Sequence, residues 1–442
     1  MKKVTLDNGF RLLYEQSKTG SETASIQIFC DFGSIHEKDQ FRGAAHFIEH
    51  MCFKGTHKIP NSRDIALNFE KHGSNVNAFT DRRYTCYFVD VHKDNVASSI
   101  HIWADMLLNS IFDRHEYDKE HEVVKEENQR SLNDYEGICF EAADQQLYAG
   151  SPYEHEVDNI RYHIGKNPLS RDSVYQMYKQ YYVPSRLILS ICCPNSFEYV
   201  KKAVEKSDFS KPQHTTSVFP PLVLALTPQT NAIYKFNTQK SITTTHICIG
   251  FRTCSSYNLD RYTLKVLKNI LGGKMSSRLF TILREDNGLT YSSSVYTDYY
   301  EHSGDFKIHA ECDTEKVFKN GDKPDGVFPL ILKLIQDLLE NGVKEEEVRL
   351  AKSYMKGKYA MKKDFCSTRA FYNGEREIYQ MENIVPYDKK FEAYIEPISK
   401  SRIDEAIHKY FVQNGMVVSV VSNSSIDRKK LVRIGESYFA QT

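Results

Sequence analysis

Two histidines and a glutamate near the N-terminus have a spacing that can bind a metal ion. They are His46, Glu49 and His50, in the stretch RGAAHFIEHMCFKGT. Residues four apart share one face of a helix, so both imidazoles can hold the same ion. Zinc suits imidazole and carboxylate ligands with one position left open, which is the pattern of a catalytic site. The ion lowers the pKa of its bound water toward neutrality, and Glu49 can take the proton.

A third ligand must come from elsewhere, and the glutamate-rich stretch EYDKEHEVVKEENQR is the candidate. Glu120 and Glu127 are seven residues apart, which is two helical turns, and therefore face the same way. Glu127 can complete the site, and Glu120 can accept a hydrogen bond from a histidine N–H behind it. The alternative is a solvated helix face beside a chance motif, because short motifs recur without function.

The composition is that of an ordinary globular protein. The chain has 442 residues, 40% of them apolar and 26% charged, and this length indicates at least two domains. Lys and Arg together number 58, as do Asp and Glu, so the basic excess typical of nucleic-acid binding is absent. Apolar stretches fall short of the roughly 20 residues that a spanning helix needs, and no membrane attachment is expected.

The N-terminus and the cysteines indicate the compartment. MKKVTLDNGFRLLYEQ has neither the apolar core of a signal peptide nor the composition of a transit peptide. Ten cysteines are scattered without a C-x-x-C pair, and a chain of this length needs no disulfides to fold. Reduced thiols and a cytoplasmic location are therefore expected. The adjacent Cys192 and Cys193 lie in an apolar stretch and are predicted to belong to the core.

Hydrophobic periodicity predicts the elements that would position these residues. In the first half they are a strand at 24–32 with Ser25 and Gln27 on its second face, the helix with HFIEH, a helix at 62–73, a strand at 75–91, a helix at 95–112, a long polar helix from about Glu116 through Tyr148, and a strand at 186–193. Residues 208–230 are rich in proline, serine and threonine, which predicts a linker.

The second half repeats this order with little residue identity. Its predicted elements are strands at 241–251, 288–300 and 304–312 and helices at 261–273 and 328–342. The predicted fold class is α+β, with two duplicated α/β-sandwich domains at 1–207 and 231–442, each a mixed, mostly antiparallel sheet with helices packed on it. The second half has VLKNILGGK where the first has its histidine helix, so one Zn²⁺ per chain is expected.

The chain resembles the inverted-zinc-motif metallopeptidases, which include mitochondrial processing peptidase, pitrilysin and insulin-degrading enzyme. Their signature is H-x-x-E-H followed by a ligand glutamate in a stretch like V-V-x-E-E. Here HFIEH is followed by VVKEEN, and the likeness makes Glu127 the ligand, with Glu126 as the alternative. The blocks LDNGFRLLYEQ, NAFTDRRYTCYF and GGKMSSRLFTILREDNGLTYSSSVY extend the resemblance over nearly the whole chain, and the length matches the two-domain subunit type.

This resemblance implies a zinc endopeptidase whose half-shells enclose a chamber for unfolded or short peptides. Within NVNAFT, which resembles the edge strand of the family, Asn77 and Ala78 would contact a peptide that adds to the sheet as a strand. The alternative for this stretch is an ordinary core strand.

A second contact implied by the resemblance lies in LREDNGLTY. Arg284 and Tyr291 are similar to the pair that contacts the substrate near the cleaved bond, where such donors can stabilise the developing oxyanion. The alternative is a surface arginine and a packed tyrosine. In the family this domain belongs to the half-shell opposite the zinc, so the pair would serve the zinc of a partner subunit. A homodimer, or a heterodimer with a related subunit, is therefore expected.

Two other functions fit the same fold. A non-catalytic scaffold subunit typically has an eroded zinc motif, whereas His46, Glu49, His50 and Glu127 are all present here. A regulatory zinc-binding protein would not require Glu49 as a base. The sequence thus favours a zinc metalloendopeptidase with the scaffold subunit as the alternative, and it leaves the peptide substrate and cleavage preference open.

Overall fold

The computed structural model describes residues 1–18, 20–157, 169–212, 226–319, 321, 325–382, 385–412 and 415–439, so much of the expected linker at 208–230 lies outside the described residues. The chain forms two compact units. The first unit is Met1–Arg130, His155–Val223 and Tyr359–Asp388, and the second is Ser131–Glu154, Leu224–Lys358 and Lys389–Thr442. Within the described ranges, no helix has the length and apolarity needed to cross a membrane.

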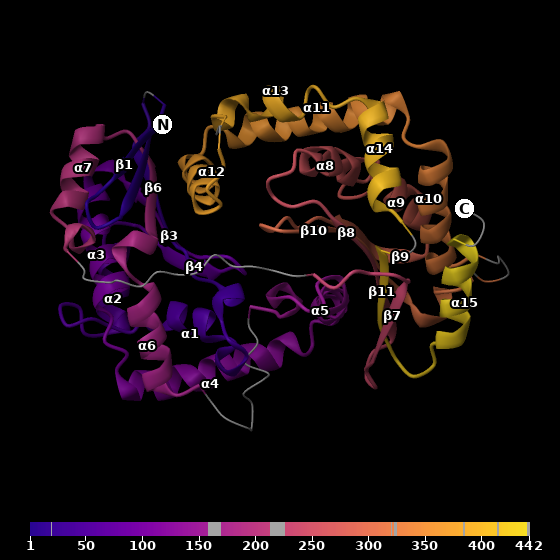
Figure 1. Ribbon diagram of the computed structural model, residues 1–442, viewed down its shortest axis with the longest axis horizontal. Coiled ribbons are helices and arrows are strands. Elements are labelled where there is room, and N and C mark those ends of the chain that lie inside the picture. The colour runs from indigo at the N-terminus through magenta and orange to yellow at the C-terminus, as the bar shows by residue number, and fades with distance from the viewer. Residues whose placement is uncertain are drawn as a thin grey trace. The chain divides into compact units, whose positions relative to one another are not determined.

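The first unit is built on a six-stranded sheet with the order β1-β2-β6-β3-β5-β4, of which Figure 1 labels β1, β6, β3 and β4. Its strands are β1 Lys2–Thr5, β2 Arg11–Gln16, β3 Thr23–Cys30, β4 Val76–Thr80, β5 Thr85–His92 and β6 Leu187–Cys193. The pair β2–β6 is parallel and the other pairs are antiparallel. The sheet is thus mixed and mostly antiparallel, as predicted, and β4 is one of its edges.

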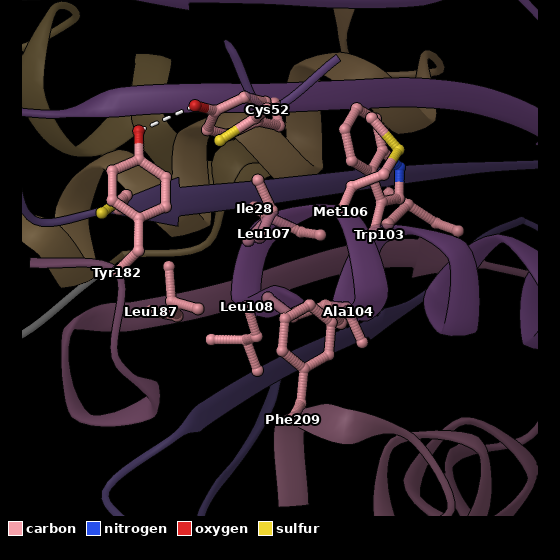
Figure 2. Packing of buried hydrophobic residues seen from close by; sticks show 14 of the residues in the cluster. Ile28, Cys52, Trp103, Ala104, Met106, Leu107, Leu108, Tyr182, Leu187 and Phe209 are labelled. Carbon is pink, nitrogen blue, oxygen red and sulfur yellow. Dashed lines mark hydrogen bonds between the residues drawn. The ribbon is translucent and has the colours of Figure 1, made fainter. Parts of the chain in front are cut away.

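One face of this sheet is covered by helices from the same half of the chain. These are α1 Ala44–Met51, α2 Ser62–Glu70, α3 Val96–Asn109, α6 Arg171–Tyr181 and α7 Phe197–Glu205. Figure 2 shows Trp103 and Leu107 of α3 packed near Ile28 of β3, all in the buried core. The hydroxyl groups of Tyr87 and Tyr182 form a hydrogen bond of 2.7 Å inside this core.

The other face of the first sheet is covered by α12 Cys366–Ile378, which comes from the second half of the chain. The Gln27 side chain donates a hydrogen bond of 3.0 Å to the Ser367 carbonyl, and Ser190 of β6 donates one of 2.7 Å to the Ala370 carbonyl. Ser25 and Gln27 are consequently only 1% and 5% exposed, so β3 is buried on both faces. The alternation of apolar and polar residues within β3 cannot reveal that its polar face is covered by a helix more than three hundred residues later in the sequence.

The second unit has a five-stranded mixed sheet with the order β7-β11-β8-β10-β9. Its strands are β7 Ile233–Thr238, β8 Thr244–Thr253, β9 Thr290–Tyr296, β10 Gly304–Asp313 and β11 Met416–Ser422. Its helices are α5 Tyr135–Leu147, α8 Asp260–Leu271, α9 Arg278–Phe280, α10 Val327–Asn341, α13 Lys390–Tyr394, α14 Lys400–Tyr410 and α15 Arg428–Phe439. A further helix, α11 Glu345–Lys362, connects this unit to the part of the first unit that begins at Tyr359. Gly250 of β8 lies under Leu147 of α5, whereas Phe251, on the opposite face, stacks on Phe411 after α14.

The predicted polar helix from Glu116 through Tyr148 is wrong, because the structure has two helices there. They are α4 Arg114–Ser131 and α5, and α5 starts at the N-cap Asp134, whose side chain accepts the Gly137 N–H at 3.0 Å. The break lets α5 join the second unit, where it covers β8 and β11. Each sheet is therefore covered on one face by a helix from the other half, and we call α5 and α12 the exchanged helices.

The predicted strand at 75–91 is likewise two strands, β4 and β5, joined by a tight turn. The Asp81 N–H donates to the Tyr84 carbonyl at 2.7 Å and closes the turn. The other predicted strands and helices each overlap an observed element of the same type, and the fold class is α+β with two mixed sheets, as predicted.

Close packing of α12 on β3 is testable at Gly374. A Cβ atom there would lie 2.0 Å from Cε2 of Phe29, which is fully buried. Gly374→Ala is expected to destabilise the first unit by about 1–3 kcal/mol, although alanine favours helix. Urea denaturation followed by fluorescence of Trp103, the one tryptophan in the chain, would report the loss as a lower midpoint.

The matched control is Gly357→Ala in α11, where a Cβ would meet no atom within 4 Å. The higher helix propensity of alanine should then raise the free energy of unfolding by roughly 0.5–1 kcal/mol, and the midpoint of urea denaturation followed by circular dichroism should not fall. An unchanged midpoint for Gly374→Ala would contradict the tight contact between α12 and β3.

Candidate metal centre

Helix α1 carries His46, Glu49 and His50, and a buried carboxylate holds its first turn. Glu37 accepts hydrogen bonds from the Gly43 N–H at 2.9 Å and the Ala45 N–H at 2.6 Å. The first N–H groups of a helix lack partners within the helix, so a carboxylate there stabilises the start. Sequence reasoning missed Glu37, although an acidic residue shortly before a helix without a Ser, Thr, Asp or Asn N-cap was an available signal.

The structure brings His46, His50 and Glu127 together. One donor atom from each lies within 4.8 Å of the others, and this group includes Glu127 rather than Glu126. The two Nε2 atoms are 3.2 Å apart, and Nε2 of His50 is 3.6 Å from Oε2 of Glu127. Two imidazole nitrogens bound to one tetrahedral zinc would lie roughly 3.3 Å apart. The donor set thus fits zinc in both chemistry and spacing.

Glu120 and Lys54 fix the orientation of His50. Nδ1 of His50 lies 2.8 Å from Oε1 of Glu120, and the Lys54 ammonium is 2.5 Å from Oε2 of the same carboxylate. Because Nδ1 is engaged by Glu120, Nε2 is turned toward His46 and Glu127. Such a partner fixes the tautomer and orientation of a ligand imidazole. Lys54 follows the end of α1, and no sequence pattern paired it with Glu120.

The charges around His50 favour a cation. Burial lowers the pKa of His50, but the hydrogen bond to Glu120 and the charges of Glu127 and Glu49 more than offset it, so the pKa is raised above its usual 6.5. Burial raises the pKa of Glu120, yet its bonds to His50 and Lys54 lower the pKa overall, which keeps the carboxylate ionised. Negative charge that stabilises an imidazolium would equally stabilise a bound metal ion.

Glu49 is 8% exposed and is held by the sheet edge. Thr80, the last residue of β4, donates a hydrogen bond of 2.5 Å to Oε2 of Glu49. The Thr80 hydroxyl is also 3.4 Å from that of Thr85, which donates to the Phe32 carbonyl. A chain of hydroxyl groups thus ties the candidate base to the sheet. Sequence reasoning singled out NVNAFT but missed Thr80 within it.

Asn77 and Ala78 lie on β4, at the edge of the first sheet. Asn77 is exposed, and its side-chain oxygen accepts the Ala78 N–H at 2.8 Å. On the inner side, Asn77 and Ala78 pair with Phe88 and Tyr87 of β5. Among the described strands, none pairs with the outer side of β4, and that side can accept a further strand.

Arg284 and Tyr291 lie together in the second unit, whereas the metal-binding group belongs to the first. Arg284 sits in a π-helical turn, Thr281–Glu285, and its guanidinium donates to the Tyr291 carbonyl at 2.9 Å. The Tyr291 side chain is 83% exposed at the start of β9 and is free to contact another molecule. The structure therefore pairs these two residues with each other.

Two family models match most of the chain between them. The family model "Insulinase (Peptidase family M16)" matches residues 12–159, and "Peptidase M16 inactive domain" matches residues 168–355. The chain is 29% identical to the zinc protease YmxG of Bacillus subtilis over 389 residues, which cover 86% of this chain and 88% of that protein. The first match contains α1 and Glu127 together.

Two solved structures share the fold. A protease from Helicobacter pylori superposes with a TM-score of 0.85 at 17% identity, over 95% of this chain and 99% of that chain. The periplasmic protease PqqL of Escherichia coli superposes with a TM-score of 0.78 at 15% identity, over 99% of this chain but 50% of that chain. In PqqL, therefore, this fold accounts for half of a longer chain.

The choice between Glu127 and Glu126 as third ligand can be tested by metal content. Glu127→Gln is expected to lose zinc during dialysis against a weak chelator, because only two nitrogen ligands remain. Glu126→Gln is the matched control, since Glu126 is also exposed and lies on the same helix, and it should retain one zinc per chain. Zinc retained by Glu127→Gln and lost by Glu126→Gln would show that the ligand is one residue earlier.

Proposed function

Because the chain belongs to peptidase family M16, we propose that it is a zinc-dependent endopeptidase that cuts unfolded or short peptides. The observation that carries this proposal is Glu49, a buried carboxylate held by Thr80 beside the group His46, His50 and Glu127. When bound there, zinc would supply a Lewis acid for the peptide carbonyl and lower the pKa of a water molecule.

Glu49 is proposed as the general base. It takes a proton from the attacking water and then delivers it to the leaving amine of the cleaved peptide. The hydrogen bond from Thr80 holds one oxygen of the Glu49 carboxylate in place. A scaffold subunit would need none of these features, which is why the peptidase is favoured over that alternative.

The substrate is proposed to bind as an added strand on β4. A peptide backbone would pair with the outer side of this edge, where Asn77 is exposed and Ala78 is half-buried. Strand addition requires an extended backbone, so unfolded or short peptides are accepted and folded segments are rejected.

We also propose that catalysis requires two chains, with Arg284 and Tyr291 of one chain acting at the zinc of its partner. PqqL supports this arrangement, because two copies of this fold would match the length of its single chain. The exposed Tyr291 hydroxyl could then donate to the oxyanion that forms on the peptide carbonyl. A homodimer would contain two such sites.

The peptidase activity is tested with a quenched-fluorescent library of unstructured peptides. Glu49→Gln should retain zinc but lose roughly 100-fold or more in cleavage rate, because the base is removed. Glu70→Gln, an exposed glutamate on α2, is the matched control and should cut at the wild-type rate. No cleavage by zinc-loaded wild type would favour the scaffold role, and equal rates for wild type and Glu49→Gln would exclude this site.

Action between subunits is tested by complementation. Tyr291→Phe alone should lose roughly 100-fold in rate through the missing oxyanion donor. When Tyr291→Phe and Glu49→Gln are co-expressed, each mixed dimer should contain one complete site. If the protein is a homodimer, about half of the dimers are mixed, so the preparation should regain about a quarter of the wild-type rate. A mixture as inactive as either variant would contradict the contribution of Tyr291 to its partner.

A further inference from the structure

Two cysteines from distant parts of the chain meet where the exchanged helix α12 begins. Cys366 is the first residue of α12, and its Sγ lies 3.6 Å from the Thr23 carbonyl of β3. Cys192 of β6 pairs with Ser25, two residues further along β3. All ten cysteines are free, and Cys366 is the one that is not buried. Both residues belong to the first unit, so their contact lies within one compact body.

The alternation of β6 explains why Cys192, and not its neighbour, faces α12. Ser190 hydrogen-bonds to the backbone of α12, and Cys192 is two residues further along the same face. Cys193 points to the opposite face and belongs to the core beneath α3 and α7. The two adjacent thiols, predicted alike as core residues, therefore have different surroundings.

The two facing thiols also differ in acidity. The hydrogen bond from Cys192 lowers the pKa of Cys366 below its usual 9.0, and burial, which raises it, is offset by a bond to Ser21 and the charge of Arg369. The same hydrogen bond, together with burial, raises the pKa of Cys192. Arg369 is itself ion-paired with Glu15, which lies beside Cys192 on β2. A partly exposed thiol that ionises readily next to a second thiol is the arrangement of a redox-sensitive pair.

We propose that Cys366 and Cys192 are a peroxide-sensitive dithiol that closes into a disulfide between α12 and β6. The Cys366 thiolate attacks one oxygen of hydrogen peroxide, the O–O bond breaks, and the departing hydroxide is protonated to water. Cys192, losing its proton, then attacks the sulfur of the resulting sulfenic acid and expels a second water. The two sulfurs are oxidised by two electrons in total, and one peroxide is reduced to two waters.

The disulfide would fix the first turn of α12 to the sheet. In the reduced protein this turn is held by the bond from Gln27 to the Ser367 carbonyl and by a weak bond of 3.6 Å from Cys366 Sγ to the Thr23 carbonyl. A covalent link adds to these contacts without involving the metal-binding group. Small-molecule thiols would reverse it by thiol–disulfide exchange, so the state of the pair would follow the level of peroxide.

The test is peptide mapping of the full-length protein after brief treatment with equimolar hydrogen peroxide and alkylation of the remaining thiols. A linked peptide joining Cys192 to Cys366 is expected in wild type and in the matched control Cys193→Ser. In Cys192→Ser, Cys366 should instead persist as a sulfenic acid that dimedone traps. In Cys366→Ser, Cys192 should remain alkylatable.

Absence of the linked peptide from peroxide-treated wild type would overturn the proposal, and so would a link from Cys366 to Cys193. The wild-type map decides this even where a serine variant fails to fold. The map reads the thiols directly, so its outcome is independent of whether the protein binds zinc or cuts peptides.

Discussion

Each sheet of this protein depends on a helix from the other half of the chain to keep its second face from water. In the first unit this face carries Leu13, Phe29 and Ile188, which pack together with Ile378 of α12. Burying one side chain of this size stabilises the fold by about 1.5–3 kcal/mol, so the cluster outweighs any ion pair at the surface. The exchanged helices are therefore structural requirements of both sheets.

The candidate metal centre is held in place by this sheet. β3 pairs with β5 and β5 with β4, so a sheet buried on both faces holds its edge strand in place. From the end of β4, Thr80 reaches Glu49, while Glu37 holds the other end of the same short helix. Glu120 on α4 then orients His50. Glu49 and His50 are thus each positioned by a contact to a different element, and α1 itself spans only about two turns.

Local patterns in the sequence predicted what is local in the structure. The spacing of His46 and His50, the apolar strands and the α+β class follow from periodicity, which depends on near neighbours. Contacts between distant residues could not be predicted in this way. The bond from Thr80 to Glu49, the pairing of Lys54 with Glu120 and the covering of Gln27 by α12 depend on the tertiary arrangement. The break before α5 was missed although Asp134 is a good N-cap, because the polar pattern continues through it.

The exchanged helix α12 also sets the order of events during synthesis. The last strand of the first sheet ends at Cys193, but the helix that covers its second face begins at Cys366, 173 residues later. At the usual pace of translation this interval is about 9 to 35 s. During this interval α12 is not yet available to cover Phe29 and Ile188. All strands of the N-terminal sheet are thus synthesised well before the helix that covers their second face.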